Sequence, residues 1–280
     1  MSIIKTAAQF AIELGQKSSE IAIEKYKEAI RPIYCATKKG TPVHEGSCVL
    51  LAFEGKHFLI TAAHIIDVNK SEDTRIYVGG ADILLEITGT YIVTPLIDGV
   101  RSKDAFDFAV LQLSDADIQG LGNVHYIAQN DIAPNRSTHE GRLYAIMGYP
   151  NKKNDSVDNE NYAVISSRWH YFSTFEYSAE LCKQLKIEGE HHIFVGYHRK
   201  RSKDFEGNII NSISLKGISG GAVFDLGDFG VPGNYAMSIK FNPLLAGIFI
   251  EAHPAYHTTV ATKISVIIEY IKAYYFETPQ

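Results

Sequence analysis

The chain has 280 residues, and its 27 Lys and Arg against 32 Asp and Glu give a net charge of −5. This length fits one domain of about 200–250 residues with an extension, or two fused barrels. The acidic balance argues against general nucleic-acid binding, which requires a basic surface. No apolar run approaches the ~18 residues of a membrane span. Three cysteines are too few, and odd in number, for a disulfide-stapled secreted scaffold.

The N-terminal segment lacks the features of an export signal, because Gln9 and Glu13 interrupt its apolar stretch. We therefore expect a cytoplasmic protein. Residues 3–30 carry apolar residues at spacings near 3.6, which predicts a helix that breaks into two pieces around Gly15 and Ser18–Glu20. Arg31 before Pro32 is expected to end it, since a proline disfavours helical backbone in the preceding residue.

The middle of the chain alternates short β-branched and aromatic runs with Gly, Asn, Asp and Pro, which indicates antiparallel strands in a sandwich or barrel rather than βαβ units. Glu54-Gly55-Lys56 is typical of a tight hairpin. The expected strands are Cys48–Phe53, His57–Thr61, Arg75–Val78, Ile83–Tyr91, Phe108–Leu113, Leu143–Met147, Tyr162–Ser167, Ile193–Tyr197, Gly221–Phe224 and Leu245–Ile250. Residues 262–275 are expected to form a final helix with the apolar stripe Ile264, Ile267, Ile268, Ile271 and Tyr274.

Three short strings carry residues suited to acyl transfer. His64 ends Thr61-Ala62-Ala63-His64, Asp107 opens an apolar strand, and Ser219 lies in the glycine-rich string Gly217-Ile218-Ser219-Gly220-Gly221. A serine hydroxyl needs a neighbouring base, and a histidine titrates near neutrality and can accept and return its proton. A buried carboxylate fixes the imidazole tautomer, while glycines let backbone N–H groups approach a developing oxyanion. Each string alone is a weak signal, but together they predict a Ser-His-Asp triad.

The chain resembles the chymotrypsin/trypsin-like serine peptidases in their disulfide-free prokaryotic form, over roughly residues 32–275. Further matching stretches are Gly46–Leu50, Tyr144–Pro150 and Ala246–Ile250. The resemblance implies an all-β fold of two antiparallel six-stranded barrels, with the triad in the cleft between them. The domains expected from it are a helical extension (1–31), a first barrel with His64 and Asp107 (32–125), and a second barrel with Ser219 and a C-terminal helix (126–280).

The same resemblance implies roles for the residues around Ser219. The N–H groups of Gly217 and Ser219 would form the oxyanion hole. Ile250, Glu251 and Ala252 would be the strand edge that pairs with an extended substrate. Ile213 would lie at the base of the primary specificity pocket, with Ser214 beside it.

Several positions depart from the family pattern. Secreted members have Cys after the catalytic His and Asp before the Ser, whereas this chain has Ile65 and Ile218. An alkyl side chain cannot hold the ammonium of a cleaved N-terminus, so zymogen activation of that kind is not expected. Trypsin-like specificity needs an Asp at the base of the pocket, where Ile213 stands, so the sequence favours an apolar or uncharged primary residue in the substrate.

Rival interpretations concern three other patterns. Gly217-x-Ser219-x-Gly221 fits the nucleophile elbow of α/β-hydrolases, but the residues that follow read as a strand rather than a helix. Glu190-His191-His192 suggests a metal site, yet adjacent strand residues face opposite ways, so we expect exposed histidines and no metal. The basic run 198–203 is expected to be a solvated hairpin tip, and the cysteines to be buried thiols.

The sequence thus predicts an intracellular serine endopeptidase without metal or organic cofactor, acting on a restricted protein or peptide target, in a stress or anti-phage response of a bacterium. Membrane and nucleic-acid partners are not expected. The N-terminal helices are a candidate surface for a regulatory protein. Two alternatives stay open: a quality-control peptidase of the HtrA-like or glutamyl type, and a non-catalytic binding scaffold with the same fold.

Overall fold

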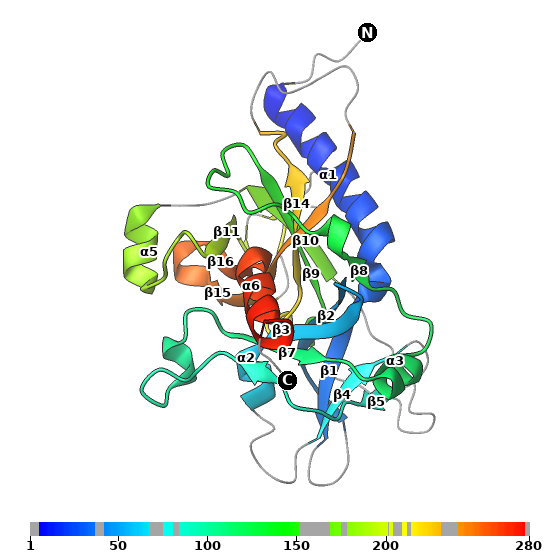
Figure 1. The fold of residues 1–280 in the computed structure, drawn as a ribbon. Coiled ribbons are helices and arrows are strands. Elements are labelled where there is room, and N and C mark those ends of the chain that lie inside the picture. Colours follow the sequence, from blue (N-terminus) through cyan, green and yellow to red (C-terminus); the bar gives the residue numbers. More distant parts are fainter. Residues whose placement is uncertain are drawn as a thin grey trace.

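Two sheets of mainly antiparallel strands lie one above the other, with helices around them (Figure 1). The structure is a computed structural model, and it describes residues 6–36, 42–67, 75–80, 84–151, 169–174, 178–200, 202–203, 209–211, 214–230 and 240–277. The predicted strand Tyr162–Ser167 lies outside these residues. No helix within the described ranges is both long enough and apolar enough to span a membrane.

The first sheet has the strand order β5-β4-β1-β2-β3-β7-β6, and β8 pairs in parallel with β2. Its turn between β2 and β3 has positive φ at both Glu54 (48°) and Gly55 (74°), the backbone of a tight hairpin, which confirms that prediction. The strands are β1 (Ile30–Ala36), β2 (Pro42–Phe53), β3 (Lys56–Ala62), β4 (Ile76–Gly79), β5 (Leu84–Glu86), β6 (Ile92–Val93), β7 (Phe108–Gln112) and β8 (Ile127–Ala128).

The second sheet has the order β10-β9-β14-β15-β16-β11, with every neighbouring pair antiparallel. A separate two-stranded ribbon joins β12 (Ser202–Lys203) and β13 (Ile209–Ile210). The six strands are β9 (Leu143–Gly148), β10 (Trp169–Thr174), β11 (His192–Gly196), β14 (Ala222–Gly227), β15 (Leu244–His253) and β16 (Thr258–Lys263).

The prediction of a mainly antiparallel β architecture is confirmed, but two closed six-stranded barrels are not found. Within the described residues the first sheet has eight strands, and each sheet has two end strands that share no ladder. β-Bulges in β2, β14 and β15 bend the sheets, because an extra residue on one strand increases the local twist. The sheets therefore curl without closing.

Helix α1 (Ala7–Tyr26) is continuous, contrary to the predicted break, and it ends before Arg31. A capping box at Thr6 starts it, and the 3₁₀ turn Lys27–Ala29 links it to β1. Gly15, Ser18 and Ser19 are buried against the second sheet, where small side chains allow close approach. The hydroxyl of Ser18 donates to the carbonyl of Leu226 at 2.8 Å, so tertiary contacts maintain the helix where its own sequence is weak.

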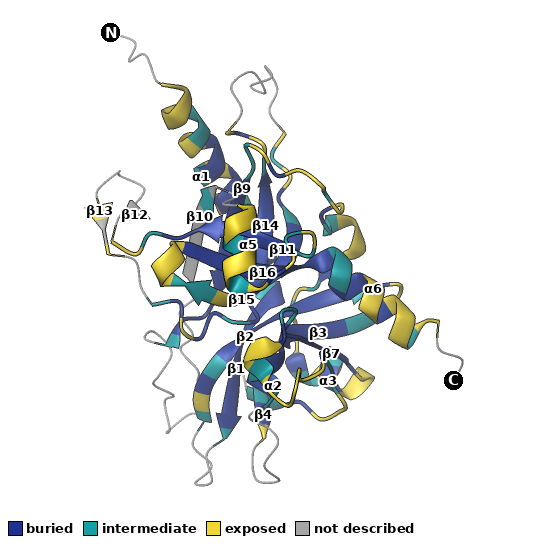
Figure 2. Ribbon diagram, turned by 90° about the vertical axis from the view of Figure 1, so that its left-hand side faces the viewer, coloured by how far each residue is buried: buried dark blue, intermediate teal, exposed yellow. Residues whose placement is uncertain are grey.

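The C-terminal half of α1 belongs to the main core, while its first turns extend beyond the sheets (Figure 2). Tyr26 is fully buried, stacks on Phe224 with ring centroids 4.8 Å apart, and donates its hydroxyl to the carbonyl of Pro243 at 2.8 Å. The same apolar cluster includes residues of both sheets and of α6, so the helix is packed into the body of the molecule. The proposed division into an extension and two β units stays a prediction.

Helix α6 (Ile264–Tyr275) confirms the predicted C-terminal helix, with one correction to its apolar stripe. Ile264, Ile267, Ile268 and Ile271 are buried, but the side chain of Tyr274 is largely exposed. Tyr274 is the penultimate residue of α6, and the apolar stripe continues instead through Tyr275, which lies four residues after Ile271 and packs against the core. The other α-helices are α2 (Ala63–Asp67), α3 (Asp115–Leu121) and α5 (Ala179–Leu185).

Candidate active site

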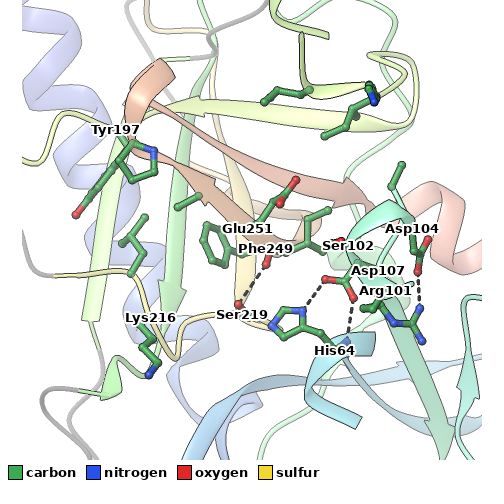
Figure 3. Close-up of a pocket in the computed structure, with 18 of the residues that line it drawn as sticks. His64, Arg101, Ser102, Asp104, Asp107, Tyr197, Lys216, Ser219, Phe249 and Glu251 are labelled. Atoms are coloured by element: carbon green, nitrogen blue, oxygen red, sulfur yellow. Dashed lines mark hydrogen bonds and ion pairs between the residues drawn. The ribbon is translucent and has the colours of Figure 1, made fainter. Parts of the chain in front are cut away.

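A cleft of about 880 Å³ brings together residues that are far apart in the chain. His64 and Asp107 come from elements of the first sheet, and Ser219 and Ile250–Ala252 come from the second. Two further segments line it, Arg101–Ala105 and Leu185–Ile187. Figure 3 shows the imidazole of His64 between the Asp107 carboxylate and the Ser219 hydroxyl. The three predicted triad residues therefore share one cleft.

His64 and Asp107 are joined by two hydrogen bonds. The backbone N–H of His64 donates to Oδ1 of Asp107 at 2.9 Å, and Nδ1 lies 2.6 Å from Oδ2. His64 is in α2, directly after β3, and Asp107 directly precedes β7, which pairs with β3. The register of these two strands thus places the pair. The carboxylate fixes the tautomer in which Nδ1 carries the proton and Nε2 faces the cleft.

Asp107 is held in an uncommon backbone conformation. Its φ is +42°, in the left-handed region that Asp tolerates better than most residues, and its carbonyl accepts from the N–H of Ala63 at 2.9 Å. Burial raises the pKa of the Asp107 carboxyl, and the hydrogen bonds and charge of His64 partly offset that rise. The buried carboxylate therefore depends on His64 as its partner.

Ser219 lies in a turn whose glycines cannot be replaced without displacing neighbours. The φ values of Gly217 and Gly220 are +91° and +83°. A Cβ on Gly217 would lie 1.7 Å from Oδ1 of Asn151, and one on Gly220 would lie 2.0 Å from the carbonyl oxygen of Ser47. The glycine-rich string is thus required by the tight packing of this turn against the first sheet and the end of β9.

Ser47 of β2 fixes the turn from the other sheet. Its N–H donates to the carbonyl of Ser219 at 2.8 Å, and its hydroxyl donates to the carbonyl of Gly217 at 3.2 Å. The same hydroxyl accepts from the N–H of Tyr149 at 2.9 Å, and the carbonyl of Ser47 accepts from the Thr61 hydroxyl at 2.7 Å. Sequence reasoning placed Ser47 in a family-like stretch but assigned it no role, because spacing alone cannot show which backbone groups a buried hydroxyl will bond.

Two backbone N–H groups at and beside Ser219 are not used in hydrogen bonds among the described residues. Among the described residues, the N–H groups of Gly217 and Ser219 have no acceptor. The carbonyl of Lys216 accepts from the N–H of Asn151 at 2.9 Å. Because a trans peptide points its C=O and N–H in opposite directions, the N–H of Gly217 points away from Asn151. Such unpaired donors beside a hydroxyl can stabilise an oxyanion.

The Ser219 hydroxyl donates to the carbonyl of Ile250 at 3.2 Å. Within the described part of the chain, no hydrogen bond joins it to Nε2 of His64. The serine, unlike the His64–Asp107 pair, is thus oriented toward its own sheet. Hydrogen bonds of this kind are often long or poorly aligned in the absence of a substrate.

Four of the five residues predicted to bind substrate line the cleft. They are Ser214, Ile250, Glu251 and Ala252, whereas Ile213 lies outside the described residues. Strand β15 pairs with β14 only up to Ile248, and beyond that it pairs with β16. On the side away from β16, no described strand pairs with residues 250–252, so an extended peptide could add there.

The charges along the cleft are unevenly paired. Arg101 binds Asp67 and Asp104, and the side chain of Lys103 lies 2.9 Å from that of Asp98. Glu251 pairs with His253 at 2.8 Å. By contrast, three cations that line the cleft have no ion-pair partner among the described residues: Lys186, Arg199 and Lys216. The cleft therefore carries excess positive charge in a protein of net charge −5.

Three other sequence patterns can be compared with the structure: the histidine pair, the cysteines and the string that resembles a nucleophile elbow. His192 is fully buried, which corrects the expectation that both strand histidines are exposed, and the described residues contain no cluster suited to a metal ion. All three cysteines are buried and free, as predicted. Ser219 is followed by strand β14, paired antiparallel on both sides, and not by a helix as in a nucleophile elbow.

Comparisons with known proteins give a likeness of fold. No family model matches the chain, and no curated protein matches it. A solved structure of a Glu endopeptidase in complex with MPD is similar to it, with a TM-score of 0.48 and 17% sequence identity over 88% of this chain and 91% of that one. This likeness concerns overall architecture and leaves the activity to be argued from the cleft itself.

Proposed function

We propose that the protein is a serine endopeptidase that hydrolyses peptide bonds through an acyl-enzyme. The observation that supports this most is the convergence of the His64–Asp107 pair and Ser219 in one cleft, beside two unpaired backbone N–H groups. Elements associated with both sheets bring these groups together. A cleft with one strand edge open for an extended peptide completes the requirement for an endopeptidase.

In the proposed acylation step, the Ser219 hydroxyl turns from the Ile250 carbonyl toward His64. Nε2 takes the hydroxyl proton as Oγ attacks the carbonyl carbon of the substrate. The N–H groups of Gly217 and Ser219 hold the resulting oxyanion, where each donor contributes about 3–4 kcal/mol of transition-state stabilisation. Asp107 stabilises the imidazolium, which returns the proton to the nitrogen of the leaving amine as the C–N bond breaks.

In the proposed deacylation step, a water molecule takes the place of the departed amine. His64 accepts one of its protons while the water oxygen attacks the ester carbon, and the same two N–H groups hold the second oxyanion. The ester bond then breaks, and His64 returns the proton to Oγ of Ser219. This releases the new carboxyl terminus and restores the enzyme.

A fluorophosphonate probe tests the proposal, because it reacts only with a serine activated by a base. We expect covalent labelling of the wild-type protein and none of Ser219→Ala. Ser102→Ala removes another, exposed hydroxyl that lines the cleft and serves as the matched control that should keep labelling. Labelling that persists in Ser219→Ala, or its absence from the wild-type protein with and without candidate partners, would refute the peptidase proposal.

The orientation of the serine hydroxyl favours one other candidate, a non-catalytic binding scaffold. Ser219 bonds to Ile250 rather than to His64, so the hydroxyl is not activated as it stands. A scaffold would bind an extended peptide along β15 without cleaving it. The two functions differ in a direct way: a scaffold retains peptide binding in Ser219→Ala and shows neither labelling nor cleavage in the wild-type protein.

We further propose that the cleft favours substrates with acidic residues near the scissile bond, since Lys186, Arg199 and Lys216 line it and form no direct ion pair within the described residues. The carboxylate of Glu45 interacts with the charge of Lys216, but no direct ion pair joins the two. The acidic residues would lie beside the primary residue of the substrate, whose apolar or uncharged character stays a prediction. Lys216→Glu should reduce cleavage of acidic peptides several-fold and reduce the dependence of that rate on salt. Lys240→Glu, whose residue does not line the cleft, is the control.

For the cellular role, we propose a restricted protein target in a stress or anti-phage response. A proteome-wide profile of cleavage sites, comparing wild type with Ser219→Ala, would identify it. A short set of sites with acidic flanks is the expected result. Broad cleavage of unfolded proteins would instead indicate a quality-control peptidase.

A further inference from the structure

The segment that carries Asp107 leads into the first sheet and is bonded to side chains of the second sheet that the triad does not include. It comprises residues 104–107 and precedes β7. The carbonyls of Ala105 and Phe106 both face polar side chains of the second sheet. Since Asp107 has φ of +42°, this segment needs external contacts to keep its shape.

His192 provides the first of these contacts. It opens β11 and is fully buried. Its Nε2 lies 2.8 Å from the carbonyl oxygen of Ala105, and its Nδ1 lies 2.7 Å from that of Glu188. The ring also stacks on Phe106, with centroids 5.7 Å apart and planes 23° apart. His192 thus connects the acid-bearing segment to the loop before β11.

Thr262 provides the second contact. It lies in β16 directly opposite His192 in the β11–β16 ladder. Its hydroxyl donates to the carbonyl of Phe106 at 2.6 Å. Two cross-strand neighbours of the second sheet therefore bind two consecutive carbonyls of the segment that ends at Asp107. We call this pair, His192 and Thr262, the acid clamp.

We propose that the acid clamp positions Asp107 for its two hydrogen bonds to His64. This inference rests on the proposed function and assigns positioning residues to the same site. The Asp107 carboxylate must meet the N–H and the Nδ1 of His64 at once, at 2.9 and 2.6 Å, which allows little rotation of the segment. Preorganised groups of this kind lose activity when their supporting contacts are removed.

The chemistry of the clamp argues against a purely space-filling role. A buried imidazole costs desolvation that an apolar ring of the same size would avoid, and burial lowers the pKa of His192 accordingly. Both nitrogens face carbonyl oxygens, which only accept, whereas a neutral imidazole has a single N–H and donates to one of them at a time. Thr262 supplies a donor to the segment that does not depend on the tautomer of His192.

Two substitutions test the clamp, and a third is the matched control. His192→Phe keeps a stacked ring but removes both nitrogens, and Thr262→Val keeps the branched shape but removes the hydroxyl. His191→Phe changes the adjacent histidine, which contacts the Phe106 ring but, within the described residues, forms no hydrogen bond to residues 104–107. All three variants are compared with wild type for thermal unfolding, so that folding is measured separately.

Two measurements report on the pair itself. The first is the rate of fluorophosphonate labelling of Ser219, which should fall about tenfold or more in His192→Phe and Thr262→Val, because misplacements near 1 Å cost up to about 10²-fold. The second is the far-downfield proton NMR signal of the His64 Nδ1–H bonded to Asp107. This signal should weaken or vanish in both clamp variants and persist in His191→Phe.

The outcomes separate this inference from the proposed function. If wild type shows the NMR signal but no labelling, the peptidase proposal fails. The signal in the variants still tests the acid clamp, because its loss supports the positioning role and its persistence contradicts it. If His192→Phe does not fold, Thr262→Val alone decides. Wild-type labelling rates and an unchanged signal in folded Thr262→Val and His192→Phe would overturn the inference.

Discussion

The cleft has two walls, one from the first sheet and one from the second. They differ in whether their polar side chains are already joined by hydrogen bonds across the predicted triad. On the first-sheet wall, His64 and Asp107 are already joined by two hydrogen bonds. On the second-sheet wall, the Ser219 turn is fixed by its glycines, but its hydroxyl bonds to Ile250 of the same sheet. In the proposed mechanism, the acid–base pair is therefore preformed, whereas the Ser219 hydroxyl has to turn from Ile250 toward His64.

Each wall is also supported from the opposite sheet. Ser47 of β2 bonds the turn that holds Ser219, and His192 and Thr262 of the second sheet bond the segment that holds Asp107. The contrast teaches that the site depends on packing between the sheets rather than on either sheet alone. The following four predictions test that view, beginning with the largest effect.

Asp107→Asn breaks the preformed wall. The side-chain amide of Asn can donate its N–H₂ to Nδ1 of His64, which leaves the imidazole proton on Nε2. In that tautomer Nε2 cannot accept the proton of Ser219. We expect the labelling rate of Ser219 to fall by about 10⁴-fold with little change in the fold. Labelling kinetics measure it, with Asp115→Asn on the exposed side of α3 as the control. A loss below tenfold would mean that Asp107 does not orient His64.

Tyr26→Ala should separate stability from chemistry. Removing a fully buried aromatic that stacks on Phe224 lowers the free energy of unfolding by about 3–5 kcal/mol. Urea denaturation measures the loss, and Ile12→Ala, at a position that is 53% exposed, should cost under about 0.5 kcal/mol. We expect folded Tyr26→Ala to label at the wild-type rate. A slowed rate would instead connect α1 to the cleft and support its proposed use as a regulatory surface.

Ser47→Ala loosens the second-sheet wall. It leaves the N–H of Tyr149 and the carbonyl of Gly217 without their buried partner, which costs about 1–3 kcal/mol of stability. The labelling rate should fall about tenfold, less than the 10²–10³-fold expected when an oxyanion donor is lost outright. Ser18→Ala, which removes a buried hydroxyl far from the cleft, should lower stability but not labelling. Equal labelling of both variants would exclude a role for Ser47 in the turn.

The smallest effect concerns His139 at the side of the second sheet. Burial and the charges of Lys263, Arg142 and Arg136 lower the pKa of His139 to about 4, from 6.5 in the unfolded chain. Between pH 4 and 6.5, His139 is protonated in the unfolded chain but neutral in the folded protein. The free energy of unfolding therefore falls as pH decreases from 6.5 toward 4. Urea denaturation across this range should show a smaller fall in His139→Gln. The same fall in both proteins would contradict the prediction.

Much of the site could be predicted from the sequence because its residues stand in short strings with specific chemistry. The strings around His64, Asp107 and Ser219 predict that these residues meet, and the cleft brings them together. The turn residues Glu54-Gly55-Lys56 predict the hairpin, whereas the strand edge at Ile250–Ala252 is implied only by the family resemblance. The supporting residues were missed for a physical reason. Ser47, His192 and Thr262 form hydrogen bonds to backbone carbonyls. Every residue has such a carbonyl, so a sequence pattern cannot show which one a side chain will bond.

The local composition of the chain determined its strands, its C-terminal helix and the residues able to perform acyl transfer. Periodicity and turn chemistry act over a few residues, so they can be read along the chain. Tertiary structure alone decided that α1 continues through Gly15 and Ser18, that no ladder among the described strands closes either sheet, and that His192 is buried against Ala105. These features arise from contacts between residues up to about 200 positions apart, which no local pattern encodes.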